Sequence, residues 1–224
     1  MSNFWDKLIV ALDLEDREKI KEVTKTLGPK GVKFKIGSIA FTKFGPDLVK
    51  ELIKSGKDVF LDLKLYDIPN TTAKAAAIIA QMGCWAFTVH LKAGRETLTA
   101  LKTAIDKETP KRGQIKPLIL GVTILTSSEA ASEEVKSLVA LADSVGLDGV
   151  VSSAHNVKEI KKSFPRLKTV VPGIRNPEDD KVDQVRVATA KEAFANGADY
   201  IVVGRPIIEK KDFLKAAREI LDKC

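Results

Sequence analysis

Short apolar runs of strand length alternate along the chain with segments in which apolar residues recur every third or fourth position. The runs are rich in Val and Ile and almost continuously apolar, which is typical of strands covered on both faces. The other segments have the period of amphipathic helices. The predicted strands are residues 8–12, 32–36, 59–65, 86–91, 117–125, 149–153, 169–171 and 200–203. Predicted helices include residues 46–54, 71–82, 96–105, 133–145, 157–164, 191–196 and 213–221.

Glycines mark the ends of several predicted helices, and they support this register. Gly56, Gly83, Gly146 and Gly197 each follow a helical segment at the position where glycine commonly ends a helix. About eight strand-then-helix units in one chain of this length are typical of a (β/α)8 TIM barrel. We therefore expect an α/β fold in which residues 1–224 form a single TIM-barrel catalytic domain, with the active site at the C-terminal strand ends.

An open doubly wound sheet is the alternative fold, because the number of strands does not prove that the sheet closes. The first predicted strand ends in Ala11-Leu-Asp13-Leu, without the glycine-rich fingerprint of dinucleotide-binding sheets.

Composition and charge narrow the possible functions. Hydrophobic residues make up 44% and charged residues 30%, which is ordinary for a globular chain. The net charge is +7, but the basic residues are interleaved with acidic ones and only 6% of residues are aromatic. This favours solvated helix faces over a nucleic-acid surface, while a positive surface would still attract a small anionic substrate.

Few residues are available for metal or disulfide chemistry. Two Cys and two His exclude a disulfide scaffold and most zinc sites. His90 and His155 have no carboxylate cluster at ligand spacing around them, so we expect them to be hydrogen-bonded or solvated. The sequence shows neither a membrane-spanning apolar run nor a signal peptide, so we expect a cytoplasmic protein that does not bind membranes.

Charged or hydroxyl-bearing residues stand at nearly every predicted strand end, which is where TIM barrels carry their chemistry. They are Asp13, Lys35, Asp62, Lys64, Asp67, His90, Thr123, Thr126, Arg175 and Arg205.

The third predicted strand carries the most informative pair. In Asp62-Leu-Lys64 strand alternation would point both charges into the barrel mouth, where they need each other or a ligand. Lys64 among carboxylates should keep its proton, which makes it a candidate general acid, although a buried ion pair without a role is the alternative. Lys33 and Lys35 share a face, and Lys35 is preferred because it is nearer the strand end.

The last quarter of the chain suggests a phosphate site. Gly204-Arg205 follows the eighth strand, where a glycine lets backbone N–H groups approach an anion and the arginine offers a forked donor. Residues 174–187 lack clean periodicity and predict a lid, and they contain Arg175 and Gln184. These residues indicate an enzyme with a phosphate-bearing ligand, an Asp/Lys centre and no evident cofactor site.

The run Asp62-Leu-Lys-Leu-Tyr-Asp-Ile-Pro-Asn-Thr71 resembles the D-x-K-x-x-D-I-P-x-T signature of the orotidine 5′-phosphate decarboxylase family. The resemblance covers nearly the whole chain in order. Its other matching segments are residues 11–13, 35–37, 125–127, 171–175, 183–186 and 203–207.

The resemblance implies that the protein converts orotidine 5′-monophosphate to uridine 5′-monophosphate and CO₂ in de novo pyrimidine synthesis, as a homodimer without cofactor or metal. Lys64 would protonate C6, Asp62 would lie against the substrate carboxylate, and Asp67 would enter the neighbouring subunit's site with Thr71 beside it. The other implied contacts are Asp13 and Lys35 with the ribose, Thr126 with the pyrimidine, and Arg175, Gln184, Gly204 and Arg205 with the phosphate.

Three alternatives stay open. Relatives that resemble hexulose-6-phosphate synthase use a similar Asp-x-Lys-x-x-Asp run to hold magnesium around a sugar-phosphate enediolate. A non-catalytic phosphate- or nucleic-acid-binding barrel would also fit the basic charge. The third alternative concerns Asp67, which could act only as a local cap of its own loop.

Overall fold

A computed structural model describes residues 4–107, 116–124, 132–175, 188–222 and 224. Its strands are β1 (Leu8–Ala11), β2 (Lys33–Gly37), β3 (Val59–Leu65), β4 (Ala86–His90), β5 (Leu118–Val122), β6 (Gly149–Val151), β7 (Lys168–Val171) and β8 (Tyr200–Val203). Its α-helices are α1 (Arg17–Leu27), α2 (Ser38–Lys54), α3 (Pro69–Met82), α4 (Gly94–Lys107), α5 (Ser132–Ser144), α6 (Ala154–Ser163), α7 (Ala190–Ala195), α8 (Arg205–Ile208) and α9 (Phe213–Leu221). Single 3-10 turns are η1 (Trp5–Lys7), η2 (Gly28–Lys30) and η3 (Leu91–Ala93).

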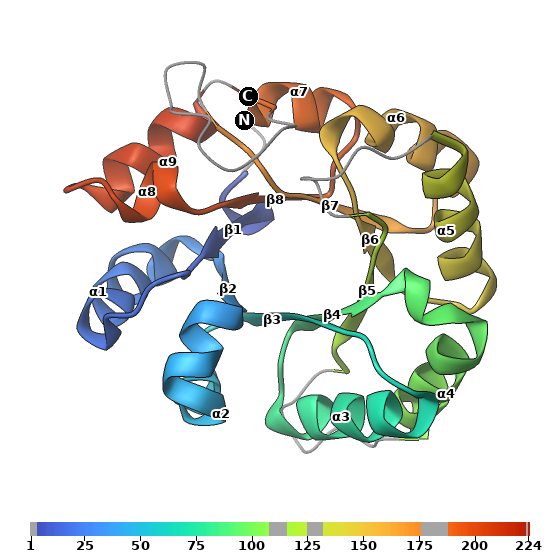
Figure 1. The fold of residues 1–224 in the computed structure, drawn as a ribbon. Coiled ribbons are helices and arrows are strands. Elements are labelled where there is room, and N and C mark those ends of the chain that lie inside the picture. The colour runs from blue at the N-terminus through green and yellow to red at the C-terminus, as the bar shows by residue number, and fades with distance from the viewer. Residues whose placement is uncertain (1–3, 108–115, 125–131, 176–187, 223) are drawn as a thin grey trace.

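The strands close into a parallel barrel in chain order, from β1 to β8. Closure is made by β1 and β8, which pair in the register Leu8↔Ile201 and Val10↔Val203. The helices lie outside the ring of strands (Figure 1). The TIM-barrel prediction is therefore confirmed, and the open-sheet alternative is wrong.

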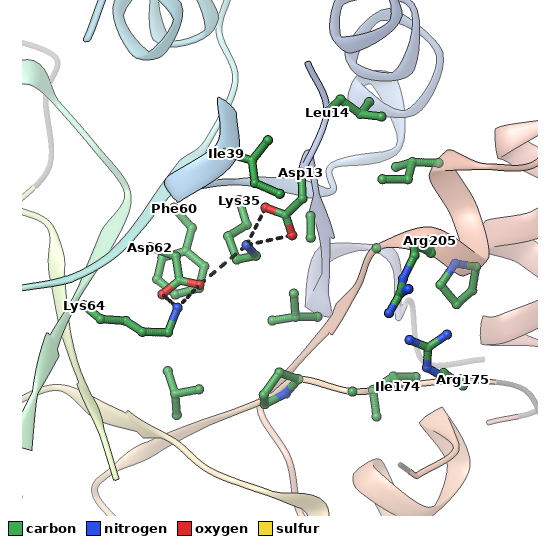
Figure 2. Close-up of a pocket in the computed structure, with 18 of the residues that line it drawn as sticks. Asp13, Leu14, Lys35, Ile39, Phe60, Asp62, Lys64, Ile174, Arg175 and Arg205 are labelled. Atoms are coloured by element: carbon green, nitrogen blue, oxygen red, sulfur yellow. Dashed lines mark hydrogen bonds and ion pairs between the residues drawn. The ribbon is translucent and has the colours of Figure 1, made fainter. Parts of the chain in front are cut away.

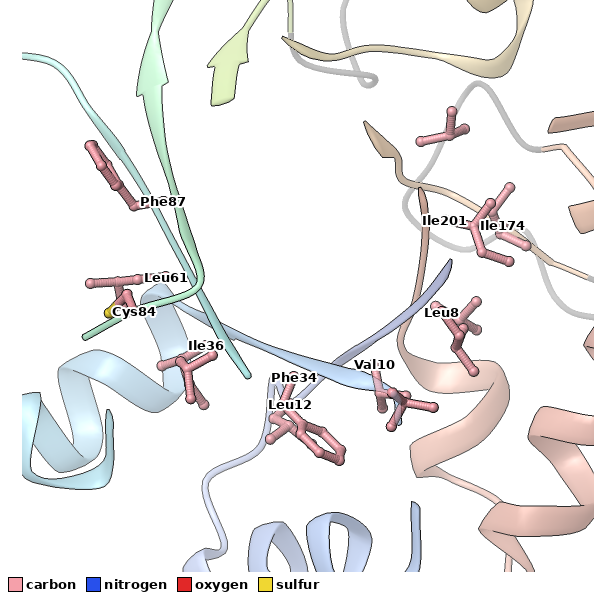
Figure 3. Close-up of a cluster of buried hydrophobic side chains, with 14 of the residues drawn as sticks. Leu8, Val10, Leu12, Phe34, Ile36, Leu61, Cys84, Phe87, Ile174 and Ile201 are labelled. Atoms are coloured by element: carbon pink, nitrogen blue, oxygen red, sulfur yellow. The ribbon is translucent and has the colours of Figure 1, made fainter. Parts of the chain in front are cut away.

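Strand alternation divides the buried side chains into two layers. Leu8 and Val10 of β1 belong to the larger layer, whose side chains point away from the barrel axis toward the helices (Figure 3). Ile9 and Ala11 belong to a smaller cluster that fills the barrel interior together with Phe60 of β3. The outer layer holds the helices on the strands, and the inner cluster forms the floor beneath the barrel mouth.

Helix boundaries differ from the expected ones mainly at α2, which begins at Ser38 instead of residue 46. Pro46 looks like a helix start because proline favours the first helical turn. In the structure Gly45 adopts φ 64°, so the chain kinks there and continues into a second helical piece. Glycine tolerates this left-handed conformation without a Cβ clash.

Within the described ranges, none of the helices is both long enough and apolar enough to cross a lipid bilayer.

Candidate active site

A cavity of about 560 Å³ opens at the carboxyl ends of the strands. Most of the residues predicted for the site line it: Asp13, Lys35, Asp62, Lys64, Arg175, Gly204 and Arg205. Thr126 and Gln184 lie outside the described residues, as does most of the predicted lid. Asp67 and Thr71 are described but do not line this cavity.

Four charged side chains from β2, β3 and the end of β1 form a continuous chain of ion pairs along one wall (Figure 2). Lys35 Nζ lies 3.1 Å from Asp13 Oδ1 and 3.5 Å from Asp62 Oδ2. Lys64 Nζ lies 3.1 Å from both carboxylate oxygens of Asp62. Asp62 therefore lies between two ammonium groups, and its side chain is only 13% exposed.

The surroundings of Asp62 keep its carboxyl group ionised. Burial by itself would raise the pKa of Asp62, but the positive charges of Lys35 and Lys64, together with hydrogen bonds, hold that pKa below its ordinary value. Hydrogen bonds from Lys64 and Thr88 act in the same direction. The negative charge of Asp62 therefore lies between two lysine side chains inside the pocket.

The backbone at Lys64 is not that of a regular strand. Lys64 has φ 50°, and the pairing of β3 with β4 shifts register between Leu61 and Leu65. The predicted alternation nevertheless continues through β3: Phe60 belongs to the inner cluster, Leu61 and Leu65 pack in the outer layer, and Asp62 and Lys64 both line the cavity. The register shift is a bulge in β3, and bulges are common next to active sites.

Lys33 and Lys35 lie at different depths of the barrel. Lys35 lines the cavity, whereas Lys33 does not. Lys33 Nζ donates a 2.7 Å hydrogen bond to the Asp6 carbonyl and lies over the rings of Trp85 and Tyr200, at 5.2 and 5.5 Å from their centroids. Burial lowers the pKa of Lys33, which packs at the amino-terminal end of the strands.

Two arginines and a glycine form the other side of the cavity. The guanidinium groups of Arg175 and Arg205 lie together, across the pocket from Asp62 and Lys64 (Figure 2). They follow β7 and β8, the strands whose loops commonly bind phosphate in TIM barrels. A ligand with an anionic group at one end would meet the arginines there and place its other end beside Lys64.

Asp67 and Thr71 lie at the exposed start of α3, outside the cavity. Asp67 Oδ1 accepts a 2.7 Å hydrogen bond from the backbone N–H of Ile68, which is a local turn contact. Its neighbours Tyr66 and Ile68 are 64% and 65% exposed, which is unusual for large apolar side chains. Neither Asp67 nor Thr71 reaches the cavity of its own chain.

Sequence reasoning missed Thr88, which contacts both members of the central pair. Its hydroxyl donates to Asp62 Oδ1 at 2.9 Å and accepts the backbone N–H of Lys64 at 2.8 Å. The available signal was its position two residues before His90 on β4, which places it on the inward face. His90 accepts the backbone N–H of Lys92 at 3.2 Å and stacks on Tyr66, while His155 is exposed.

Comparison with known proteins gives consistent matches over almost the full length. The model of the orotidine 5′-phosphate decarboxylase / HUMPS family matches residues 6–220. Orotidine 5′-phosphate decarboxylase of Coxiella burnetii (strain RSA 493 / Nine Mile phase I) is 42% identical, over 97% of this chain and 95% of the relative. The protein of that name from Legionella pneumophila (strain Corby) is 43% identical, over 91% and 92%. The crystal structure of orotidine 5′-phosphate decarboxylase from Lactobacillus acidophilus superposes with a TM-score of 0.83 at 35% identity, over 96% of this chain and 97% of that one.

Proposed function

The chain belongs to the orotidine 5′-phosphate decarboxylase / HUMPS family and decarboxylates orotidine 5′-monophosphate to uridine 5′-monophosphate, and we propose that the charged wall of its cavity performs this reaction without a cofactor. The reaction breaks a carbon–carbon bond, so the enzyme is a lyase of pyrimidine biosynthesis.

The cavity suggests one orientation for the nucleotide. Its phosphate binds at Arg175, Gly204 and Arg205, since two guanidinium groups provide forked donors for phosphate oxygens. The orotate ring then lies at the opposite side, beside Asp62 and Lys64. The ribose lies between these ends, with its hydroxyls at Asp13 and Lys35. We propose that Thr126 and Gln184 complete the pyrimidine and phosphate contacts.

The chemical step follows from this placement. The bond between C6 and the carboxylate breaks, CO₂ leaves, and the bonding electron pair stays on C6. The Lys64 ammonium stabilises this developing charge and transfers a proton to C6, after which Lys64 takes a proton from solvent. Asp62 keeps the ammonium in place, and its fixed charge lies where the substrate carboxylate must enter.

The single observation that carries this assignment is the position of Lys64 Nζ, 3.1 Å from both oxygens of a buried carboxylate at the end of the cavity opposite the arginines. An ammonium group that is fixed before the reaction does not have to reorganise as charge develops. Binding of the distant phosphate supplies energy that holds the reacting ring against it.

We also propose that the active site is shared between two subunits. Asp67 lies outside its own cavity, in a loop with the exposed side chains of Tyr66 and Ile68. A twofold interface at this loop would cover these apolar side chains and bring Asp67, with Thr71 beside it, to the partner's barrel mouth. The turn contact of Asp67 with Ile68 supports the alternative in which Asp67 acts only as a loop cap.

The remaining expectations are part of the same proposal. Residues 1–224 form one catalytic domain that acts in the cytoplasm on a free nucleotide. Neither nucleic acid, a membrane nor a metal ion takes part.

An absorbance assay with excess chelator tests the proposed chemistry. Purified protein in EDTA should convert orotidine 5′-monophosphate to uridine 5′-monophosphate at the same rate as in added magnesium. Activity that disappears with EDTA and returns with magnesium would favour the metal-dependent alternative. Absence of turnover together with steeply salt-dependent binding to DNA or RNA would favour the non-catalytic one.

A further inference from the structure

Thr88 is a fully buried hydroxyl directly behind the charged wall. It lies on β4 and is 0% exposed, and it is not among the residues that line the cavity. Its Oγ1 atom is 2.9 Å from Asp62 Oδ1 and 2.8 Å from the backbone nitrogen of Lys64. Thr88 therefore contacts both residues of the central pair without reaching the substrate space.

The direction of these two hydrogen bonds is determined by chemistry. A backbone N–H only donates, so the Thr88 oxygen must accept from Lys64. The single hydroxyl proton is then free to point at Asp62, whose ionised carboxylate only accepts. The two contacts together tie the Asp62 carboxylate and the Lys64 backbone to one side chain, and the bond to Asp62 is strongest while Asp62 is charged.

Thr88 also stands opposite the bulge of β3. Leu61 pairs with Phe87 and Leu65 pairs with Val89, so Thr88 is the β4 residue that faces the extra length of β3. Lys64 has φ 50° there, outside the regular strand conformation. The Thr88 hydroxyl oxygen accepts the hydrogen bond of the Lys64 backbone N–H at this irregular position.

We propose that Thr88 is a positioning residue for the decarboxylation, which holds the Asp62 carboxylate and the Lys64 backbone so that the Lys64 ammonium stays aimed into the cavity. This inference rests on the proposed function of Lys64. It assigns to Thr88 no contact with the substrate, since Thr88 acts only through its two neighbours.

This role predicts a separation between catalysis and binding. Loss of the hydroxyl should misplace Lys64 and lower kcat, whereas the phosphate contacts across the cavity are untouched and KM should change little. The carboxylate of Asp62 would also lose a donor, so its pKa should rise. The acidic limb of the kcat/KM profile should therefore move to higher pH.

The experiment compares Thr88→Val with Thr88→Ser. Valine keeps the shape of threonine but lacks the hydroxyl, and serine keeps the hydroxyl. We expect Thr88→Val to lower kcat about 10- to 100-fold with KM within about threefold. Thr88→Ser should stay within about threefold of the parent kcat and keep the parent pH profile.

Thr169 offers a matched control on β7. It is also 0% exposed, and its Oγ1 donates to Asp199 Oδ2 at 3.2 Å and accepts the N–H of Asp199 at 3.3 Å. This motif lies at the amino-terminal end of the strands, away from the cavity. Thr169→Val should lower Tm as Thr88→Val does, but leave kcat and the pH profile unchanged.

The inference is overturned if folded Thr88→Val keeps kcat within twofold of the parent, or if Thr88→Ser is as impaired as Thr88→Val. Should Thr88→Val not fold, Thr88→Cys takes its place, because a thiol is only a weak donor, and the same two criteria apply. Lys64→Ala is measured beside them. If Lys64→Ala is inactive and Thr88→Val is parent-like, only the role of Thr88 is refuted, whereas an active Lys64→Ala refutes the proposed function of Lys64.

Discussion

Lys64 combines an unusual backbone with the central chemical role in the proposed reaction. Among the residues that the structure describes, it is the only non-glycine residue with positive φ. A side chain in this left-handed region destabilises the backbone by about 1–2 kcal/mol. Such strain persists where the surroundings impose it, and it is common at functional sites. Here the bulge and the hydrogen bond to Thr88 impose it, and the result is an ammonium group directed at the cavity.

This conformation predicts an order of stability for two inactive variants. Lys64→Gly and Lys64→Ala both remove the ammonium group, but only alanine keeps a Cβ at φ 50°. Relief of the strain exceeds the extra unfolded-state entropy of glycine, so the free energy of unfolding should be about 0.5–1 kcal/mol higher for Lys64→Gly. Urea unfolding of the two variants measures the difference. A more stable Lys64→Ala would show that the left-handed backbone at this position is not retained.

The strands and their order could be predicted from the sequence more accurately than the details at the strand ends. Continuous apolar runs identified all eight strands, and β3 and β8 have the predicted bounds. The first half of α2 was not predicted, because a Gly45-Pro46 kink inside a helix has the same sequence pattern as the start of a helix. The bulge in β3 and the contact with Thr88 depend on the register between β3 and β4, which cannot be predicted from the residue pattern of either strand alone. The charged site residues could be identified from the sequence because charges are rare in apolar strands. A single threonine in such a strand is common, so Thr88 could not be identified in this way.

Gly37, at the end of β2, leaves no room for a larger side chain beside the ion pair of Asp13 and Lys35. A Cβ atom at Gly37 would lie 2.7 Å from Asp13 Oδ1 and 2.9 Å from Lys35 Nζ. Gly37 has ordinary extended backbone, so Gly37→Ala should fold and displace the Asp13–Lys35 ion pair. We expect kcat/KM to fall about 10- to 100-fold, because small displacements of positioning groups have effects of this size.

Gly28→Ala is the control for this variant. Its Cβ would meet the ammonium end of Lys57, but this side chain does not line the cavity and can move into solvent. Parent-like kcat/KM is expected for Gly28→Ala. If Gly37→Ala also behaves like the parent, the ion pair between Asp13 and Lys35 has no part in substrate binding.

The barrel mouth of one chain holds the charged wall and the arginines but not Asp67. The exposed side chains of Tyr66, Ile68 and Ile78 lie on and before α3, where a partner would cover them. The shared site that we propose would make catalysis depend on association, even though each barrel is closed by its own strands.

Mixing inactive subunits tests whether the site is shared. Lys64→Ala and Asp67→Ala subunits that have exchanged should recover roughly a quarter of parental activity, because about half of the dimers would contain one intact site. The control mixes Lys64→Ala with Asp62→Ala, whose residues belong to the same strand and should not complement each other. If exchange is demonstrated and the first mixture stays as inactive as the control, Asp67 acts within its own chain.

The proposed role of Lys64 is to stabilise the charge at C6 and to protonate it. Its most direct test is kcat of Lys64→Ala with orotidine 5′-monophosphate, measured on protein whose circular dichroism and cooperative thermal unfolding match those of the parent. Removal of one preorganised electrostatic donor typically lowers kcat by about 10²–10³, and a proton donor is lost as well, so we predict a decrease of at least this size. A folded Lys64→Ala enzyme with kcat within about tenfold of the parent would contradict this role of Lys64.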